Sequence, residues 1–113
     1  LADTVARYGG EEFVILLPVT ELAGAALLAE RIRGAVAELE LASEGRRLSL
    51  TLSVGVACCV PDREKDYEWL IRTADEALYE AKTSGRNRTR VAREMANGGI
   101  ELTSPERLQA SRD

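Results

Sequence analysis

The sequence predicts an α/β fold in which helices pack on a sheet. Three observations support this prediction: an apolar run after a Gly-Gly pair, a stretch in which apolar and hydroxyl residues alternate, and two segments with apolar residues every three or four positions. In chain order they give strand, strand, helix, strand, helix and strand, typical of a sandwich of two layers or slightly more. The length of 113 residues allows one domain.

The N-terminal segment predicts a β-hairpin. Two short extended stretches, Asp3–Tyr8 and Phe13–Leu17, lie on either side of Gly9 and Gly10. Glycine accepts the positive φ that a tight hairpin turn needs. The second stretch is apolar on both faces and is stopped by Pro18, so we expect it inside a covered sheet.

A first helix is predicted from Glu21 to about Glu40, with Thr20 as its N-cap. Glu30 and Arg33 belong to its solvated face. Its apolar residues recur every three or four positions and should form one stripe against the sheet: Leu22, Ala25, Leu28, Ile32, Val36 and Leu39.

The clearest period-two pattern runs from Leu48 to Val56 and predicts a strand. Cys58 and Cys59 continue it, and we assign both a structural role because nothing nearby would lower a thiol pKa. The alternate positions that should share one face are Leu48, Leu50, Leu52, Val54 and Val56.

A second helix is predicted from Asp66, its N-cap, to about Ser84. Gly85 then stands where a left-handed C-terminal residue belongs. A short last strand, Thr89–Ala92, follows. Beyond Glu94 the glycines, a Ser-Pro pair and scattered charges predict a loose tail.

Composition excludes several classes of function. The chain has no histidine, so it cannot contain a Ser-His-Asp triad or a His-ligated metal site. A net charge of -4 argues against a nucleic-acid partner, and no apolar run is long enough to span a membrane. Two adjacent cysteines cannot build a disulfide framework, which fits a reducing, cytoplasmic setting.

The cations gather after the second predicted helix. Five lie between Lys82 and Arg93 with no acid among them, which leaves 10 Lys and Arg against 19 Asp and Glu elsewhere. Lys82, in the last helical turn, and Arg86 can present two positive charges to one phosphate group. A solvated basic strand would give the same composition, and the helix dipole alone explains Lys82, so both interpretations stay open.

The hairpin turn carries a second cluster. Gly9 and Gly10 let a backbone turn approach a ligand closely, and Glu11 and Glu12 follow at once. Strand geometry points these two carboxylates to opposite faces, so they cannot share one role. A carboxylate at the turn can bind Mg²⁺, which takes one or two protein carboxylates plus substrate phosphates. A plain turn with two solvated glutamates fits the pattern as well.

Together the two clusters resemble those of the GGDEF domains, the catalytic domains of diguanylate cyclases. Residues 7–13 (RYGGEEF) are similar to the signature hairpin in its GGEEF form, and residues 53–57 (SVGVA) resemble a strand of the family. Residues 74–82 (ADEALYEAK) and 85–87 (GRN) resemble the helix and turn that follow it. Four motifs in the family's order cover roughly residues 1–92.

The resemblance implies an enzyme that condenses two GTP into cyclic di-GMP and releases two pyrophosphates. The reaction takes place between two domains that face each other, with Mg²⁺ or Mn²⁺ as cofactor, so the implied partners are GTP, cyclic di-GMP and a second copy of the domain. The implied roles are Gly9 and Gly10 near the nucleotide, Glu11 on the metal and in activation of the 3′-hydroxyl, Glu12 as the second signature acid, and Lys82 and Arg86 on the phosphates.

A product-inhibition site is implied as well. In the family an R-x-x-D motif ends five residues before the signature, and Asp3 lies at that spacing, with its arginine falling before Leu1. Arg31 matches a further arginine that some members use to bind the product. A solvated helix charge explains Arg31 equally well.

The resemblance implies a ferredoxin-like, nucleotidyl-cyclase palm-type fold: a central antiparallel sheet with flanking helices. Family members carry a further strand and two helices ahead of the signature, with the other metal-binding aspartate and the guanine-recognising residues. We therefore expect residues 1–92 to be the C-terminal part of a GGDEF domain that lacks this first strand and these helices, and residues 93–113 to be a flexible tail. We expect this fragment to be inactive alone and to be ordered by self-association.

Two functions are left open. The first is an enzyme fragment, a cytoplasmic diguanylate cyclase domain in second-messenger signalling. The second is a regulatory GGDEF-like module that binds cyclic di-GMP or GTP without catalysis. The intact GGEEF sequence favours the enzyme, because a degenerate signature would be typical of the module.

Overall fold

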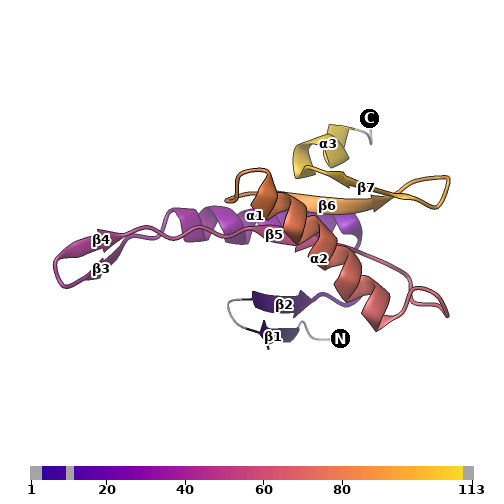
Figure 1. The fold of residues 1–113 in the computed structure, drawn as a ribbon, viewed down its shortest axis with the longest axis horizontal. Helices are drawn as coiled ribbons and strands as arrows, with labels where there is room; N and C mark the ends of the chain where they lie inside the picture. Colours follow the sequence, from indigo (N-terminus) through magenta and orange to yellow (C-terminus); the bar gives the residue numbers. More distant parts are fainter. Residues whose placement is uncertain (1–3, 10–11, 111–113) are drawn as a thin grey trace.

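The computed structural model of the chain describes residues 4–9 and 12–110. The expected mixed α/β class, with flanking helices, is confirmed (Figure 1). The strands of the described part form three separate sheets, β1–β2, β3–β4 and β5–β6–β7. The elements are β1 (Thr4–Gly9), β2 (Glu12–Leu16), α1 (Leu22–Ala37), β3 (Leu41–Ser43), β4 (Arg46–Leu48), β5 (Val54–Val56), α2 (Tyr67–Thr83), β6 (Thr89–Glu94), β7 (Ile100–Thr103) and α3 (Pro105–Ala110).

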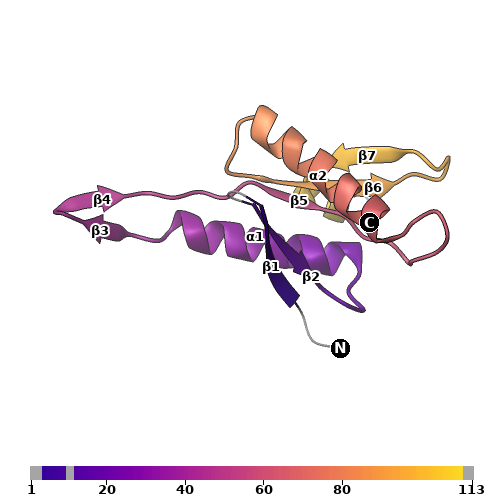
Figure 2. The same ribbon diagram turned by 60° about the horizontal axis from the view of Figure 1, so that its bottom comes forward.

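The three-stranded sheet is the centre of the fold. Its middle strand, β6, runs parallel to β5 and antiparallel to β7. The connection between the two parallel strands is α2, which packs on both of them, while α1 lies against the opposite face (Figure 2). Parallel strands need such a crossover, and here it puts α2 on one face of the sheet, while α1, which precedes β5, covers the other.

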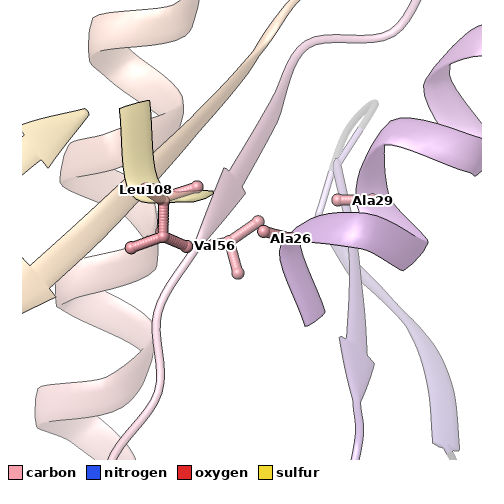
Figure 3. Close-up of a cluster of buried hydrophobic side chains, with 5 residues drawn as sticks. Ala26, Ala29, Val56 and Leu108 are labelled. Carbon is pink, nitrogen blue, oxygen red and sulfur yellow. The ribbon is translucent and has the colours of Figure 1, made fainter. Parts of the chain in front are cut away.

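The main buried cluster lies on the α1 face of this sheet. Ala26 and Ala29 of α1 meet Val56 of β5, and Leu108 of α3 closes the cluster (Figure 3). Val91 of β6 is fully buried among them. Small alanines let α1 approach the sheet closely, so few large side chains are needed here.

Close packing on the other face depends on Gly55 in the middle of β5. A Cβ atom at this position would lie 2.2 Å from the carbonyl oxygen of Ala74 and 2.3 Å from the amide nitrogen of Leu78, both in α2. No real contact is that short, so only glycine lets α2 sit here. The glycine of the 53–57 motif therefore has a packing role.

The helix boundaries confirm one predicted cap and correct the other. A side-chain oxygen of Asp66 accepts a hydrogen bond from the Trp69 amide at 2.9 Å, which caps α2 as predicted. Thr20 does not cap α1: Glu21 holds the N-cap position without a side-chain bond. The Thr20 hydroxyl instead donates to the Pro18 carbonyl oxygen at 3.2 Å, because the chain turns immediately after that proline.

The predicted strand from Leu48 to Val56 is wrong over its middle. Leu48 ends β4 of a short hairpin that extends away from the sheet, and only Val54–Val56 is a strand (Figure 1). Leu50 and Leu52 are 50% and 36% exposed. A strand is defined by its ladder, and no strand of the described part pairs with residues 49–53, so alternation alone does not make one there.

The expected loose tail is also wrong for residues 93–110. β6 continues to Glu94, β7 pairs with it in antiparallel register, and α3 follows. Leu108 is 6% exposed and belongs to the main cluster. A four-residue strand and a six-residue helix are too short to show periodicity, so the pattern did not reveal them. The domain boundary at residue 92 stays a prediction.

Candidate functional site

The hairpin β1–β2 carries the first part of the site. The two strands pair antiparallel, with Gly9 opposite Glu12, as the sequence predicted. Glu12 opens β2 and its side chain is partly buried. Gly10, Glu11 and Asp3, all named as site residues from the sequence, lie outside the described residues.

The C-terminal end of α2 carries the second part. Lys82 lies in the last helical turn, as predicted, and the helix ends at Thr83. The turn that follows has positive φ at three consecutive residues: Gly85 at 138°, Arg86 at 62° and Asn87 at 47°. A single left-handed glycine was expected, but two residues with side chains continue the left-handed path.

These two parts meet through an ion pair. The ammonium nitrogen of Lys82 lies 3.4 Å from a carboxylate oxygen of Glu12, although the residues are 70 positions apart in the chain. The Lys82 side chain is 36% exposed and that of Glu12 is 38% exposed. The fold therefore brings a residue of the signature turn and a cation of the second cluster together at an accessible place.

The remaining cations of this stretch differ in what they contact. Arg90 pairs with Glu80 at 2.8 Å, and Arg93 pairs with Glu101 at 2.6 Å. Arg88 donates from its Nε to the carbonyl oxygen of residue 86 at 3.0 Å. Within residues 4–9 and 12–110, the exposed Arg86 side chain makes no hydrogen bond or ion pair.

These contacts indicate that Lys82 and Arg86 are the cations of this stretch best placed to bind a ligand. Arg90 and Arg93 are each held by a carboxylate, which explains them without a ligand. Among the described residues, the Lys82 ammonium has only a long, partly buried ion pair, and Arg86 stands in a constrained turn. Both remain able to bind an anion such as a phosphate group.

Three further residues support the turn, and the sequence interpretation missed their role. Glu30 and Arg33 of α1, assigned to the solvated face, form an ion pair at 2.6 Å with side chains only 26% and 23% exposed. Arg33 also donates to the side-chain oxygen of Asn87 at 2.8 Å. The hydroxyl of the buried Thr89 donates to Glu30 at 2.8 Å. The three-residue spacing of Glu30 and Arg33 predicts their pair, but no local signal predicts a contact 54 residues away.

Electrostatics agree with this geometry. The hydrogen bond from Arg33 holds the pKa of the Glu30 carboxyl below its ordinary value, and the bond from Thr89 adds to that. The bond to Glu30 raises the pKa of the Arg33 guanidinium. Burial raises the pKa of the Cys58 and Cys59 thiols, which fits the structural role predicted for them.

For a metal, the described residues offer one carboxylate at the site. Glu12 lies at the start of β2, and no group of three or more His, Cys, Asp or Glu that could hold a metal occurs within residues 4–9 and 12–110. A partly exposed carboxylate fits a hard cation such as Mg²⁺ only if phosphate oxygens complete the coordination. Arg31, the other predicted product-site residue, lies on the exposed side of α1.

Comparison with models of protein families identifies the family to which the chain belongs. The profile described as "Diguanylate cyclase, GGDEF domain" matches residues 1–88. The chain belongs to the GGDEF family. All residues of the Glu12–Lys82 contact and of the left-handed turn at 85–87 lie inside the matched GGDEF region. All of β6, β7 and α3 lies beyond it.

Relatives of this GGDEF chain include named diguanylate cyclases. It is 42% identical over 92 residues to diguanylate cyclase A of Treponema denticola, covering 81% of this chain and 24% of the relative. It is 44% identical over 91 residues to diguanylate cyclase DgcP of Pseudomonas aeruginosa, covering 80% and 13%. It is 47% identical over 88 residues to diguanylate cyclase DosC of Escherichia coli, covering 77% and 19%. The chain thus spans a quarter or less of the length of these relatives, and no helix in the described part of the GGDEF chain could cross a bilayer.

Proposed function

We propose that this chain supplies the phosphate-binding part of a diguanylate cyclase. In the full-length protein, two GTP-loaded domains face each other. Each 3′-hydroxyl gives up its proton, which Glu11 helps to remove, and its oxygen bonds to the α-phosphorus of the opposite GTP as the bond from that phosphorus to pyrophosphate breaks. The observation that carries this proposal is the contact of Glu12 with Lys82. It joins the signature hairpin, residues 7–13, to the cationic turn, which is the C-terminal end of α2 with residues 85–87. Similarity to named diguanylate cyclases supports the reaction.

Each residue of the chain then has a distinct task. Lys82 and Arg86 neutralise charge on the phosphates, and Gly9 and Gly10 leave room for the nucleotide beside the backbone. Glu11 holds Mg²⁺ or Mn²⁺, and a bound divalent ion would offset negative charge on the phosphates. Glu12 holds Lys82 in place while the site is empty of nucleotide, since the two charges lie 3.4 Å apart.

Three further statements belong to the same proposal. The domain works in the cytoplasm, where GTP is available, and it works as a pair. Asp3 and Arg31 contribute to binding of the product, cyclic di-GMP, as an inhibitor. The 113 residues alone do not turn over GTP, because the family's second metal-binding aspartate and its guanine-recognising residues match no position among them.

The test is an activity assay on the full-length protein with GTP and Mg²⁺, analysed for cyclic di-GMP. We expect the native protein to make product, Glu12→Ala to lose most activity, and Glu76→Ala to behave as the native protein. Glu76 is an exposed carboxylate of α2 that makes no contact with the site, so it controls for loss of charge.

Two results would contradict the proposal. If Glu12→Ala keeps full activity, the signature turn is not part of the active site. If the native protein makes no product but binds cyclic di-GMP or GTP, the regulatory module replaces the enzyme.

A further inference from the structure

We propose that Arg33 is a positioning residue for the phosphate-binding turn, acting through Asn87. This inference rests on the proposed function for the part that concerns GTP. It concerns α1, a helix that carries none of the residues assigned to the phosphates, and it assigns a role to a side chain that the sequence places on a solvated surface.

The turn needs external support because its backbone is strained. Arg86 and Asn87 both have φ in the left-handed region, at 62° and 47°. Such a conformation costs a residue with a side chain roughly 1–2 kcal/mol, although asparagine tolerates it better than most. Two in succession persist only where neighbouring groups hold them.

The main-chain bonds of the turn hold its ends. The amide of Arg86 donates to the carbonyl oxygen of Ala81 at 2.9 Å, and the carbonyl oxygen of Arg88 accepts from the Val54 amide at 3.0 Å. Between these two anchors, Asn87 is held by one guanidinium nitrogen of Arg33, which lies 2.8 Å from its side-chain oxygen and 3.5 Å from its carbonyl oxygen. Arg33 is thus the contact from outside the turn that fixes its apex.

The opposite edge of the Arg33 guanidinium group is also held by hydrogen bonds. Its Nε donates to Glu30 at 2.6 Å, and Glu30 in turn accepts from the hydroxyl of Thr89, which is 2% exposed. The planar guanidinium can serve a carboxylate and an amide oxygen at the same time, which an ammonium group cannot do in the same geometry. The chain of contacts runs from buried β6 through α1 to the turn that carries Arg86.

The first experiment measures amide hydrogen exchange of the full-length protein without nucleotide, so it does not depend on the proposed function. We expect Arg33→Gln to speed exchange in peptides covering residues 84–88 by about tenfold, the effect of losing one charged hydrogen bond. Asn87→Asp keeps the acceptor and should leave exchange slow, whereas Asn87→Ala removes the shorter of the two bonds from Arg33 and should speed exchange in the same direction as Arg33→Gln. Arg72→Gln, an exposed arginine of α2, serves as the matched control.

The second experiment measures steady-state kinetics with GTP. Because Arg86 would contact phosphate both before and during the reaction, a displaced turn should raise KM about three- to tenfold and leave kcat within about twofold. The double variant Arg33→Gln/Asn87→Ala should be no worse than either single variant, since both remove the same contact. If Arg33 had only a structural role, Arg33→Gln would lower the free energy of unfolding without raising KM at a nearly constant kcat.

Each outcome decides the inference. Unchanged exchange at residues 84–88 in both Arg33→Gln and Asn87→Ala overturns it, even if activity falls. Faster exchange with an unchanged KM also overturns it, because the turn would then not serve the phosphates. If the native protein has no activity, the proposed function fails by itself, and the exchange result still tests whether Arg33 holds the turn. Should Arg33→Gln not fold, Asn87→Ala, which keeps the Glu30–Arg33 pair, replaces it.

Discussion

The two parts of the site lie on elements that differ strongly in burial. The hairpin β1–β2 that presents Glu12 keeps apolar side chains on its surface, with Val5 67% and Phe13 66% exposed. Lys82 and Arg86 lie at and just after the end of α2, which packs on the sheet β5–β6–β7. This sheet is covered on both faces, and Val91 is fully buried in it. Within the described residues, no strand ladder joins the hairpin to that sheet.

This difference implies that a mutation can affect the Glu12 carboxylate without affecting the Lys82 and Arg86 cations, and the reverse. The cationic turn is fixed by packing of α2 and by the Glu30–Arg33–Asn87 contacts, whereas in the described part of the hairpin its ion pair with α2 is the partly buried contact of Glu12 with Lys82. Mutations in the sheet should therefore change stability strongly, and mutations in the hairpin should change it little. Four predictions test this contrast.

The largest effect is expected for Gly55→Ala. The new Cβ would collide with the backbone of α2, so the helix must move from the sheet, at a cost of about 3 kcal/mol or more in the free energy of unfolding. Urea unfolding checks this. Gly34→Ala is the matched control: it has nothing within 4 Å and lies inside α1, so it should stabilise by about 0.5–1 kcal/mol. Equal effects at both positions would contradict the packing argument.

Valine to alanine in each region gives a direct comparison. Val91→Ala should leave a cavity in the main cluster and cost about 2 kcal/mol. Val5→Ala, on the exposed hairpin, should change stability by less than about 0.5 kcal/mol. A Val5→Ala loss as large as that of Val91→Ala in thermal unfolding would show that the hairpin is buried in solution.

Acid should weaken the contacts behind the cationic turn. The pKa of Glu30 is lowered in the folded chain, so its contribution is present above the ordinary value of 4.5 and is lost as pH falls below it, through the folded value. We expect a loss of about 1 kcal/mol between pH 6 and strongly acidic pH that Glu30→Gln abolishes. Unfolding measured against pH checks this, with exposed Glu38→Gln as control. An unchanged slope in Glu30→Gln would contradict the prediction.

The smallest effect is expected for the ion pair that joins the two regions. A double-mutant cycle of Glu12→Gln and Lys82→Met should give a coupling of about 0.5 kcal/mol or less, because both groups are more than one third exposed. The coupling should shrink further in 1 M salt. A salt-independent coupling of several kcal/mol would mean that the hairpin is rigidly docked.

Local signals predicted the fold where a few neighbouring residues decide the structure. Asp66 caps α2, and β1 and β2 pair as an antiparallel hairpin, because each depends on residues only a few positions away. Alternation misled at Leu50 and Leu52, since a strand also needs a partner that no periodicity reveals. Leu108 gave no signal, because one apolar residue in a six-residue helix has no pattern to belong to.

For the site, the residue types were predictable but their support was not. The sequence pointed to Lys82, Arg86 and the signature glutamates through motif and charge. It placed Arg33 on a solvated surface, because a single helix pattern cannot show that a turn 54 residues later will fold onto that face. Motifs record which groups meet the ligand, whereas the contacts that hold them arise only from the tertiary fold.

The pair of Glu12 and Lys82 also sets an order of events during synthesis. With 70 residues between them, a ribosome adding about 5–20 residues per second needs roughly 4–14 s to make the second after the first. For that interval the Glu12 carboxylate exists without the ammonium group with which it later pairs. The contact between the two parts of the site therefore forms only after α2 has been synthesised, however early the hairpin itself pairs.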